Sequence, residues 1–320
     1  MALARHIAFA FAVLFTPWCG AVDPYPTKPV RIVVATGAGT TDDIAARVVA
    51  ARMAELLGQP FFIENRPGAG GSIGQTFVMR APPDGYTLLL AGGSMAGARY
   101  ANANVTYDVL KDFTPISLLG SNAFALVVNS SLAVKDVKDL IAYAKANPGK
   151  VTYGTIGAGQ IPYWSVNLFN NMAGIQSLVH EVPYKATPDV LTDIVAGRVD
   201  YYITGVGAIL PLKDKLRVLG VTTQARDVAL PDVPPIAETL PGYDMPAWVS
   251  LMGPAKMQPE HVLTLNKAVV ESLATPQVRE RYLKAGFMPT PSEPDALRQR
   301  YEHWMGVFAK IAKDVGLKPQ

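Results

Sequence analysis

The sequence contains almost no cysteine, and its single example lies in a segment unlike the rest of the chain. Cys19 is the only cysteine among 320 residues. It falls within an N-terminal stretch that has the layout of a secretory signal. Once that stretch is removed the mature chain has no cysteine, which excludes disulfides and thiol-based catalysis.

Three features of the N-terminus predict this signal. A short basic region precedes an uninterrupted apolar run over residues 7–15, and small residues stand at the −3 and −1 positions of a cut after Ala21. A lipid-attached Cys19 is the disfavoured alternative, because the bulky Trp18 directly precedes it. We therefore expect residues 1–21 to be a cleavable signal peptide and the mature protein to reside in the periplasm.

The sequence also lacks a large excess of charge of either sign. The chain has 29 basic and 26 acidic residues, a net charge of +3, and loss of the signal with its one arginine leaves +3 − 1 = +2. There is no arginine-rich run, zinc-finger spacing or RNP-type aromatic motif, so we expect no nucleic-acid binding. Beyond the signal, no stretch reaches the ~20 apolar residues of a transmembrane helix.

Recognisable catalytic patterns are missing as well. None of the four histidines belongs to an HExxH motif or lies near a second histidine. Ser94 and Ser165 do not stand in a G-x-S-x-G setting, and the glycine loops lack the spacing of a dinucleotide fingerprint or a P-loop. The sequence therefore predicts a binding protein rather than an enzyme, with no cofactor and no metal site.

What the sequence does contain is a regular alternation of strands and helices. Short loops between them are typical of a mainly parallel sheet covered by helices on both faces. The predicted strands are 30–34, 61–63, 87–91, 151–153, 179–184, 201–203, 216–221 and 248–252, with two further apolar runs within 114–128. The predicted helices are 43–57, 73–80, 138–147, 163–173, 188–196, 261–274, 276–285 and 295–315.

Local signals predict how some of these helices begin and end. Asp43 or Thr41 is suited to cap the start of helix 43–57, and Gly58 to end it. Ser292, three residues before Asp295, forms a capping pair at the start of the last helix. The apolar stripe of that last helix is predicted to pack on the first lobe.

Two glycine loops hold equivalent positions in two successive α/β series. Loops 36–41 and 155–160 each leave the carboxyl end of a strand and enter a helix, where ligands bind in open α/β sheets. Backbone N–H groups at helix starts bind carboxylate or phosphate. Facing each other, the loops would hold a small dianion. The alternative, two ordinary strand-to-helix turns, is equally open at this point.

Eight sequence blocks carry a family resemblance over nearly all of the mature chain. They are YPTKPVRIVV (25–34), ENRPGAGGSIG (64–74), PDGYTLL (83–89), YDVLKDFTPIS (107–117), LIAYAKANPGKVTYGT (140–155), VPYKATPDVLTDIVAGRVD (182–200), LRVLGVTT (216–223) and LPDVP (230–234). In this order they resemble the Bug-type periplasmic substrate-binding proteins of tripartite tricarboxylate transporters. The block at 64–74 is interpreted as a shaped turn that supports the first lobe rather than as the main ligand contact.

The resemblance implies a two-lobed periplasmic-binding-protein fold of the Venus flytrap, type II, form. Each lobe would be a mainly parallel sheet flanked by helices, with the ligand cleft between the lobes. We assign residues 22–122 and 229–320 to lobe 1 and residues 123–228 to lobe 2. The implied function is to capture a small carboxylate, as a monomer and without catalysis. The implied partners are the large and small membrane subunits of a tripartite permease.

The expected ligand contacts lie on the two glycine loops and in blocks that match the family. They are Thr36, Gly37, Ala38, Gly39, Thr40, Asp43 and Ser94 in lobe 1, and Thr155, Gly157, Ala158, Gly159, Gln160, Tyr163 and Asp200 in lobe 2.

Both loops depart from the family's usual pattern, so the ligand is the least transferable property. Gln160 and Tyr163 stand where the family usually has Gly-Ser-x-x-His, which makes an aromatic or amphiphilic carboxylate as well supported as citrate. Asp42 either points to solvent, the favoured prediction, or meets an amide, amine or hydroxyl of the ligand. Trp164 faces either the cleft or the core. A ligand-presenting sensory receptor and, less favoured, an enzyme on the same scaffold are the alternative functions.

Overall fold

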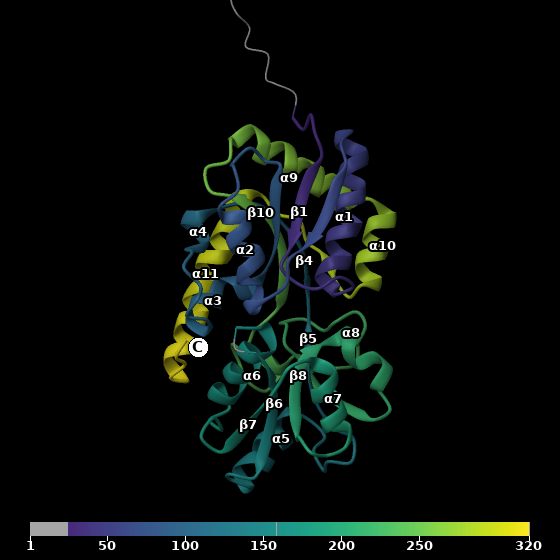
Figure 1. Ribbon diagram of the computed structural model, residues 1–320. Helices are drawn as coiled ribbons and strands as arrows, with labels where there is room; N and C mark the ends of the chain where they lie inside the picture. Colours follow the sequence, from purple (N-terminus) through teal and green to yellow (C-terminus); the bar gives the residue numbers. More distant parts are fainter. Residues whose placement is uncertain (1–24, 158, 320) are drawn as a thin grey trace, which may run out of the picture.

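The computed structural model describes residues 25–157 and 159–319 (Figure 1). The predicted signal peptide and Ala158 lie outside these residues. The described chain forms two lobes, each built around one sheet with helices against it. The predicted two-lobed α/β fold is confirmed. Within these residues, no helix combines the length and the apolar character needed to cross a membrane.

Lobe 1 is built on a six-stranded sheet of order β11-β4-β10-β3-β1-β2. Its strands are β1 (Val30–Val34), β2 (Phe61–Asn65), β3 (Thr87–Gly92), β4 (Phe113–Asn122), β10 (Ala247–Pro254) and β11 (Met288–Pro289). The strands β2, β1 and β3 pair in parallel, whereas β10 runs antiparallel to β3 and β4, and β11 runs antiparallel to β4. β10, the second-last strand in the sequence, thus lies between β4 and the parallel strands β3, β1 and β2.

Helices cover both faces of this sheet. One face carries α1 (Thr41–Leu57), α9 (Pro259–Ala274) and α10 (Pro276–Lys284), and the other carries α2 (Ser72–Met79) and α11 (Pro294–Asp314). Along β1 the side chains alternate, since Ile32 and Val34 belong to the core under α1 whereas Val33 belongs to the opposite core. Short elements complete the lobe: η1 (Ala69–Gly71), η2 (Gly93–Gly97), α3 (Ala98–Ala101) and α4 (Val109–Asp112).

Lobe 2 has a five-stranded sheet of order β7-β6-β8-β5-β9. Its strands are β5 (Phe124–Asn129), β6 (Val151–Ile156), β7 (Val179–Tyr184), β8 (Tyr201–Gly205) and β9 (Leu216–Val221). β6 pairs in parallel with β7 and β8, and β5 is antiparallel to β8 and β9. Its helical elements are α5 (Val137–Ala146), α6 (Ile161–Met172), α7 (Thr187–Val195), α8 (Val206–Ile209), η3 (Leu210–Leu212) and η4 (Ile236–Glu238).

The two lobes are joined by two neighbouring stretches of chain. β4 passes into β5 through Ala123, and the chain returns from β9 to β10 over residues 222–246. Thr222 ties the two stretches together. Its backbone N–H donates to the Phe124 carbonyl, its hydroxyl accepts from the Phe124 N–H, and its carbonyl accepts from the Met245 N–H. The hinge is therefore a small hydrogen-bonded assembly rather than one flexible strand.

The returning segment differs from the predicted lobe boundary. Residues 229–246 were assigned to lobe 1, but much of this stretch lies on lobe 2. Pro235 bridges Val221 at the end of β9, and a Cβ on Gly220 would lie 2.9 Å from the Ile236 side chain. The Tyr243 hydroxyl donates to the Ser165 carbonyl of α6 at 3.1 Å. The crossing back to lobe 1 therefore comes just before β10.

The last helix packs on lobe 1, as predicted, and also reaches lobe 2. α11 contacts β4 and η2 of lobe 1 and α6 of lobe 2. Phe308 packs on Trp164 of α6 with ring centroids 4.9 Å apart and the ring planes tilted by 44°. Gly97 lies against both rings, because a Cβ there would come within about 3 Å of each. An apolar contact thus connects the lobes beside the hinge.

Two helix caps differ from the sequence-based expectation. The Thr40 hydroxyl, not Asp43 or Thr41, accepts from the Asp43 N–H at the start of α1, because Asp43 is engaged elsewhere. Gly58 ends α1 with φ 68°, the left-handed conformation that favours glycine. Ser292 does not cap α11; instead, its hydroxyl accepts from the Leu118 N–H and fixes the helix entry to β4.

Candidate ligand-binding cleft

A cavity of ≈ 390 Å³ lies between the lobes, at the carboxyl ends of strands from both sheets. Lobe 1 contributes Thr40, Thr41, Asp42, Gly92, Gly93, Ser94, Asn122, Ala247, Trp248, Val249, Ala285, Gly286 and Phe287. Lobe 2 contributes Phe124, Ile156, Gln160, Ile161, Pro162, Thr187, Thr204, Gly205, Val206, Gly207 and Ala208. This is where open α/β sheets place their ligands.

Three helices of nine or more residues begin at this cavity. α1 starts at Thr41, α6 at Ile161 and α7 at Thr187, and each of these residues lines the cavity. The first backbone N–H groups of a helix have no partner within the helix, and its start carries a partial positive charge. One helix start from lobe 1 thus faces two from lobe 2. This arrangement suits an anion held between the lobes without a cationic side chain.

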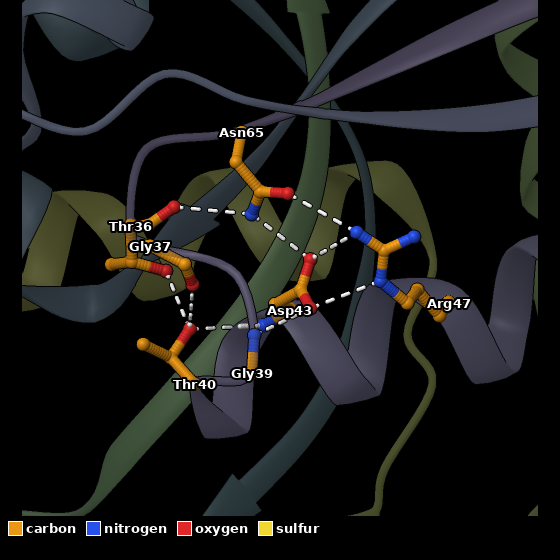
Figure 2. A network of polar contacts seen from close by, with 7 residues as sticks. All are labelled: Thr36, Gly37, Gly39, Thr40, Asp43, Arg47 and Asn65. Carbon is orange, nitrogen blue, oxygen red and sulfur yellow. Dashed lines mark hydrogen bonds and ion pairs between the residues drawn. The ribbon is translucent and has the colours of Figure 1, made fainter.

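The loop that enters α1 is held in shape by Asp43, as Figure 2 shows. The Asp43 carboxylate accepts from the Gly39 N–H at 2.9 Å, from Arg47 at 2.9 and 3.0 Å, and from the Asn65 amide at 2.9 Å. The Asn65 amide also donates to the Thr36 carbonyl at 3.1 Å. These contacts join the loop, α1 and β2 into one rigid unit.

The surroundings of Asp43 keep its carboxyl ionised. The hydrogen bond from Arg47, with those from Gly39 and Asn65, lowers the pKa of Asp43 to about 2. The side chain is almost fully buried, with 3 % exposed. Its carboxylate oxygens are engaged by the loop, α1 and β2, so Asp43 shapes the cleft wall from behind.

Asp42 has the opposite environment. It is half-buried, lines the cleft, and makes no hydrogen bond or ion pair with any residue that the structure describes. Burial raises the pKa of Asp42 to about 6. The sequence favoured a solvent-facing Asp42, but the structure places this carboxyl in the cavity wall.

The second glycine loop brings Gln160 to the cavity from lobe 2. Gly157 and Gly159 have φ 57° and 96°, values that L side chains rarely adopt, and Gly159 lies against Ala101 of lobe 1. Thr155 points the other way and donates to Glu181 at 2.6 Å within lobe 2. Of the described residues in this loop, Ile156 and Gln160 line the cavity.

Two other predicted contacts, Tyr163 and Asp200, also lie away from the cavity, and Trp164, left open between cleft and core, faces the core. Tyr163 and Trp164 are 8 % and 0 % exposed, because the first turn of α6 directs them into the apolar core. Asp200 precedes β8 and accepts from the backbone N–H and hydroxyl of Thr152 at 2.8 and 2.9 Å. This is the amino end of β8, whereas the cleft lies at its carboxyl end, beyond Thr204.

The predicted site residues therefore fall into three groups. Those that line the cavity are Thr40, Ser94 and Gln160. Those near it, on the loops or beside them, are Thr36, Gly37, Ala38, Gly39, Asp43, Gly157 and Gly159. Those inside or at the far end of lobe 2 are Thr155, Tyr163 and Asp200; Ala158 is outside the described residues.

The apolar part of the cavity comes from residues that the sequence did not mark. Phe124 follows the hinge, Trp248 lies on β10, and Phe287 follows α10. Gly93 is required beside Trp248, because a Cβ there would lie 2.6 Å from the indole ring. These segments are far apart in sequence, and only the fold brings these residues to one cavity.

A second hollow of ≈ 300 Å³ adjoins the cavity and shares Ser94 with it. Ala69 and Gly70 of the glycine-rich block line it, with Asn102 and, from lobe 2, Gly159. The Asn102 amide donates to the Ala69 carbonyl at 3.0 Å. The block thus forms the edge of the cleft region rather than its centre.

Comparison with known proteins agrees with this architecture. The sequence model of the tripartite tricarboxylate transporter family receptor matches residues 45–311. A protein of R. palustris solved with adipate is 33% identical and superposes with a TM-score of 0.81, covering 92% of this chain and all of the other. MatC of Rhodopseudomonas palustris, solved with malate, is 31% identical with a TM-score of 0.77, covering 90% and 100%.

The periplasmic binding protein BugD is also similar. It is 28% identical with a TM-score of 0.78, and the match covers 92% of this chain and 100% of BugD. The Bug-type resemblance seen in the sequence blocks is therefore confirmed by both the family match and the fold.

Proposed function

The chain belongs to the tripartite tricarboxylate transporter receptor family, and we propose that it captures a small carboxylate between its lobes for delivery to the large and small membrane subunits of a tripartite permease. One observation carries the proposal. The starts of α1, α6 and α7, from both lobes, open onto one cavity. As a receptor of this family, the protein acts by binding and release and without catalysis.

Binding is coupled to closure of the lobes. A carboxylate ligand that contacts the start of α1 on one side and accepts from N–H groups of α6 or α7 on the other interacts best when the lobes are close together. The tied hinge around Thr222 restricts the motion to a rotation of one lobe against the other. The closed, loaded form is then the one that the permease recognises.

The cavity favours a ligand with an apolar body. Phe124, Trp248 and Phe287 provide aromatic surface, and Ile156 and Val249 add aliphatic surface. The relatives solved with adipate and malate hold acyclic dicarboxylates. An amphiphilic or aromatic carboxylate therefore fits this cavity at least as well as citrate, although on other residues than Tyr163 and Trp164.

We place the mature protein in the periplasm, exported through the signal at residues 1–21. BugD, with which it shares its fold, is a periplasmic binding protein. The mass of the protein recovered from the periplasmic fraction of an expressing Gram-negative cell tests this. It should equal that of a chain beginning at Val22. A full-length mass, or retention in the cytoplasm, would contradict it.

The ligand proposal is tested by the melting temperature of the mature protein with a panel of mono-, di- and tricarboxylates, aromatic acids and amino acids. A ligand that binds only the folded form stabilises it by RT ln(1 + [L]/Kd), so about 2.7 kcal/mol at a hundredfold excess over Kd. The methyl ester of each active acid is the control. A panel in which no acid stabilises the protein, or in which esters match the acids, would count against a carboxylate receptor.

A further inference from the structure

Asp42 is the only ionisable side chain lining the cleft within the described residues. Every other lining side chain is apolar, a glycine, or a neutral hydroxyl or amide, and no lysine, arginine or histidine is among them. The cleft of a carboxylate receptor therefore carries one acid and no base. A second carboxylate on a ligand would meet like charge on the lobe 1 side.

The neighbouring Asp43 shows that this acid is not needed to build the loop. Asp43 has every acceptor position occupied by Gly39, Arg47 and Asn65, and it holds loop 36–40 in place. Asp42 contacts none of these groups, and no hydrogen bond or ion pair to its carboxylate is formed in the described part of the chain. The paired carboxylates thus separate into one that shapes the wall and one that is presented to the ligand.

The position of Asp42 also determines where a ligand carboxylate can bind. Asp42 is the second residue of α1, so its negative charge lies at the start of this helix. That charge weakens the attraction of the helix start for another anion. The starts of α6 and α7 in lobe 2 carry no acidic side chain that lines the cleft. A ligand carboxylate is therefore directed to lobe 2, and its other end to Asp42.

We propose that Asp42 binds a protonated amine, and that the ligand is a zwitterionic amino carboxylate whose carboxylate lies at lobe 2 and whose ammonium lies at lobe 1. This inference rests on the proposed receptor function and names the ligand class of the same cleft. The ammonium supplies the donors that the Asp42 carboxylate lacks, and the net charge of the filled cleft becomes −1 rather than −3. The aromatic residues Phe124, Trp248 and Phe287, which line the cavity from both lobes, cover the apolar segment between the two charged ends.

Ligands of equal length that differ only at one end test this directly. Binding of succinate and 4-aminobutyrate, glutarate and 5-aminopentanoate, and adipate and 6-aminohexanoate is measured by calorimetry for the mature protein and for Asp42→Asn. The protein is expected to prefer the amino acid of the best pair by roughly tenfold or more, as for a partly buried charge pair. Asp42→Asn is expected to lose that preference and to bind the dicarboxylate more tightly than the parent does.

Asp295→Asn is the matched control. Asp295 is an exposed acid in the first turn of α11, away from the cleft, so its replacement should leave the preference unchanged. Dicarboxylate binding that equals or exceeds amino-acid binding in every pair overturns the role of Asp42 while supporting a carboxylate receptor. The role of Asp42 is also overturned if Asp42→Asn changes the affinities for both members of a pair equally. Binding of no carboxylate in these pairs or in the wider panel overturns the receptor function together with this inference.

Discussion

Replacing Asp43 by asparagine removes the charge that holds loop 36–40 to α1. Its pKa of about 2, against an ordinary value of 3.8, corresponds to roughly 2 kcal/mol of stabilisation at neutral pH, at about 1.4 kcal/mol per pKa unit. The asparagine amide also turns a donor toward Gly39 N–H or Arg47, and leaving a buried donor unsatisfied costs about 1–3 kcal/mol. We expect Asp43→Asn to lose about 2–4 kcal/mol in the free energy of unfolding at pH 7.

The pH dependence of this loss has a definite sign. Because the folded pKa of Asp43 lies below its unfolded value, its stabilisation is complete above about pH 4 and disappears as the pH falls toward about 2. The difference between the parent and Asp43→Asn should therefore narrow across that interval. Urea unfolding followed by tryptophan fluorescence at a series of pH values measures it. A variant as stable as the parent at pH 7, or a gap independent of pH, would refute the role of Asp43 in the loop.

Asp42→Asn is the matched substitution one residue away, and its effect should have the opposite sign. The pKa of Asp42 is raised to about 6, so the ionised carboxylate costs stability in the ligand-free protein above that pH. Asp42→Asn should therefore be more stable than the parent above pH 6, and the two should converge below about pH 4. Equal losses of unfolding free energy in both variants would contradict the contrast between the hydrogen-bonded Asp43 and Asp42, which has no hydrogen-bond partner among the described residues.

Two further substitutions test the contacts between the lobes. Gly159→Val should weaken ligand binding at least tenfold in calorimetry, since a Cβ at Gly159 would lie 3.1 Å from Ala101 of lobe 1 and hinder closure; Gly197→Val, with a similar positive φ and open space around it, should leave affinity unchanged. Phe308→Ala should lower the free energy of unfolding by about 3–5 kcal/mol in urea, as for a buried aromatic ring, and shift the tryptophan fluorescence, because its ring packs on Trp164 and Trp304. Unchanged emission would mean that the Phe308 ring is not part of the apolar contact between the lobes.

Much of the fold could be predicted because its signals are local. The strands at 30–34, 179–184 and 216–221 were placed within their observed bounds, since short strand-like segments between turn residues leave few alternatives. Gly58 was assigned as a helix end for a similarly local reason, the need for a positive φ. The segment at 229–246 was assigned to lobe 1, although much of it lies on lobe 2. Its proline-rich sequence has no hydrophobic periodicity, and only its contacts with β9 show where it lies.

The candidate site was less accessible to sequence reasoning. Two glycine loops were placed at the cleft, yet the direction of each side chain along them depends on contacts distant in sequence. Asp43 turns inward because Asn65 of β2 and Arg47 meet it there, which leaves Asp42 for the cavity. Asp200 belonged to a family block but lies at the amino end of its strand. The strand end would have been the useful signal, since cavity residues such as Thr204 stand at carboxyl ends.

Hydrogen exchange of the mature protein with and without a saturating carboxylate tests the central claim most directly. The starts of α1 and α6, from opposite lobes, are expected to contact the same ligand and to be covered by the same closure. Exchange should therefore slow in the segments around 40–44 and 160–164 together, while the amino end of β8, near Asp200, stays unchanged. Slowing confined to one lobe, or to the glycine-rich segment 64–74 alone, would contradict binding between the lobes.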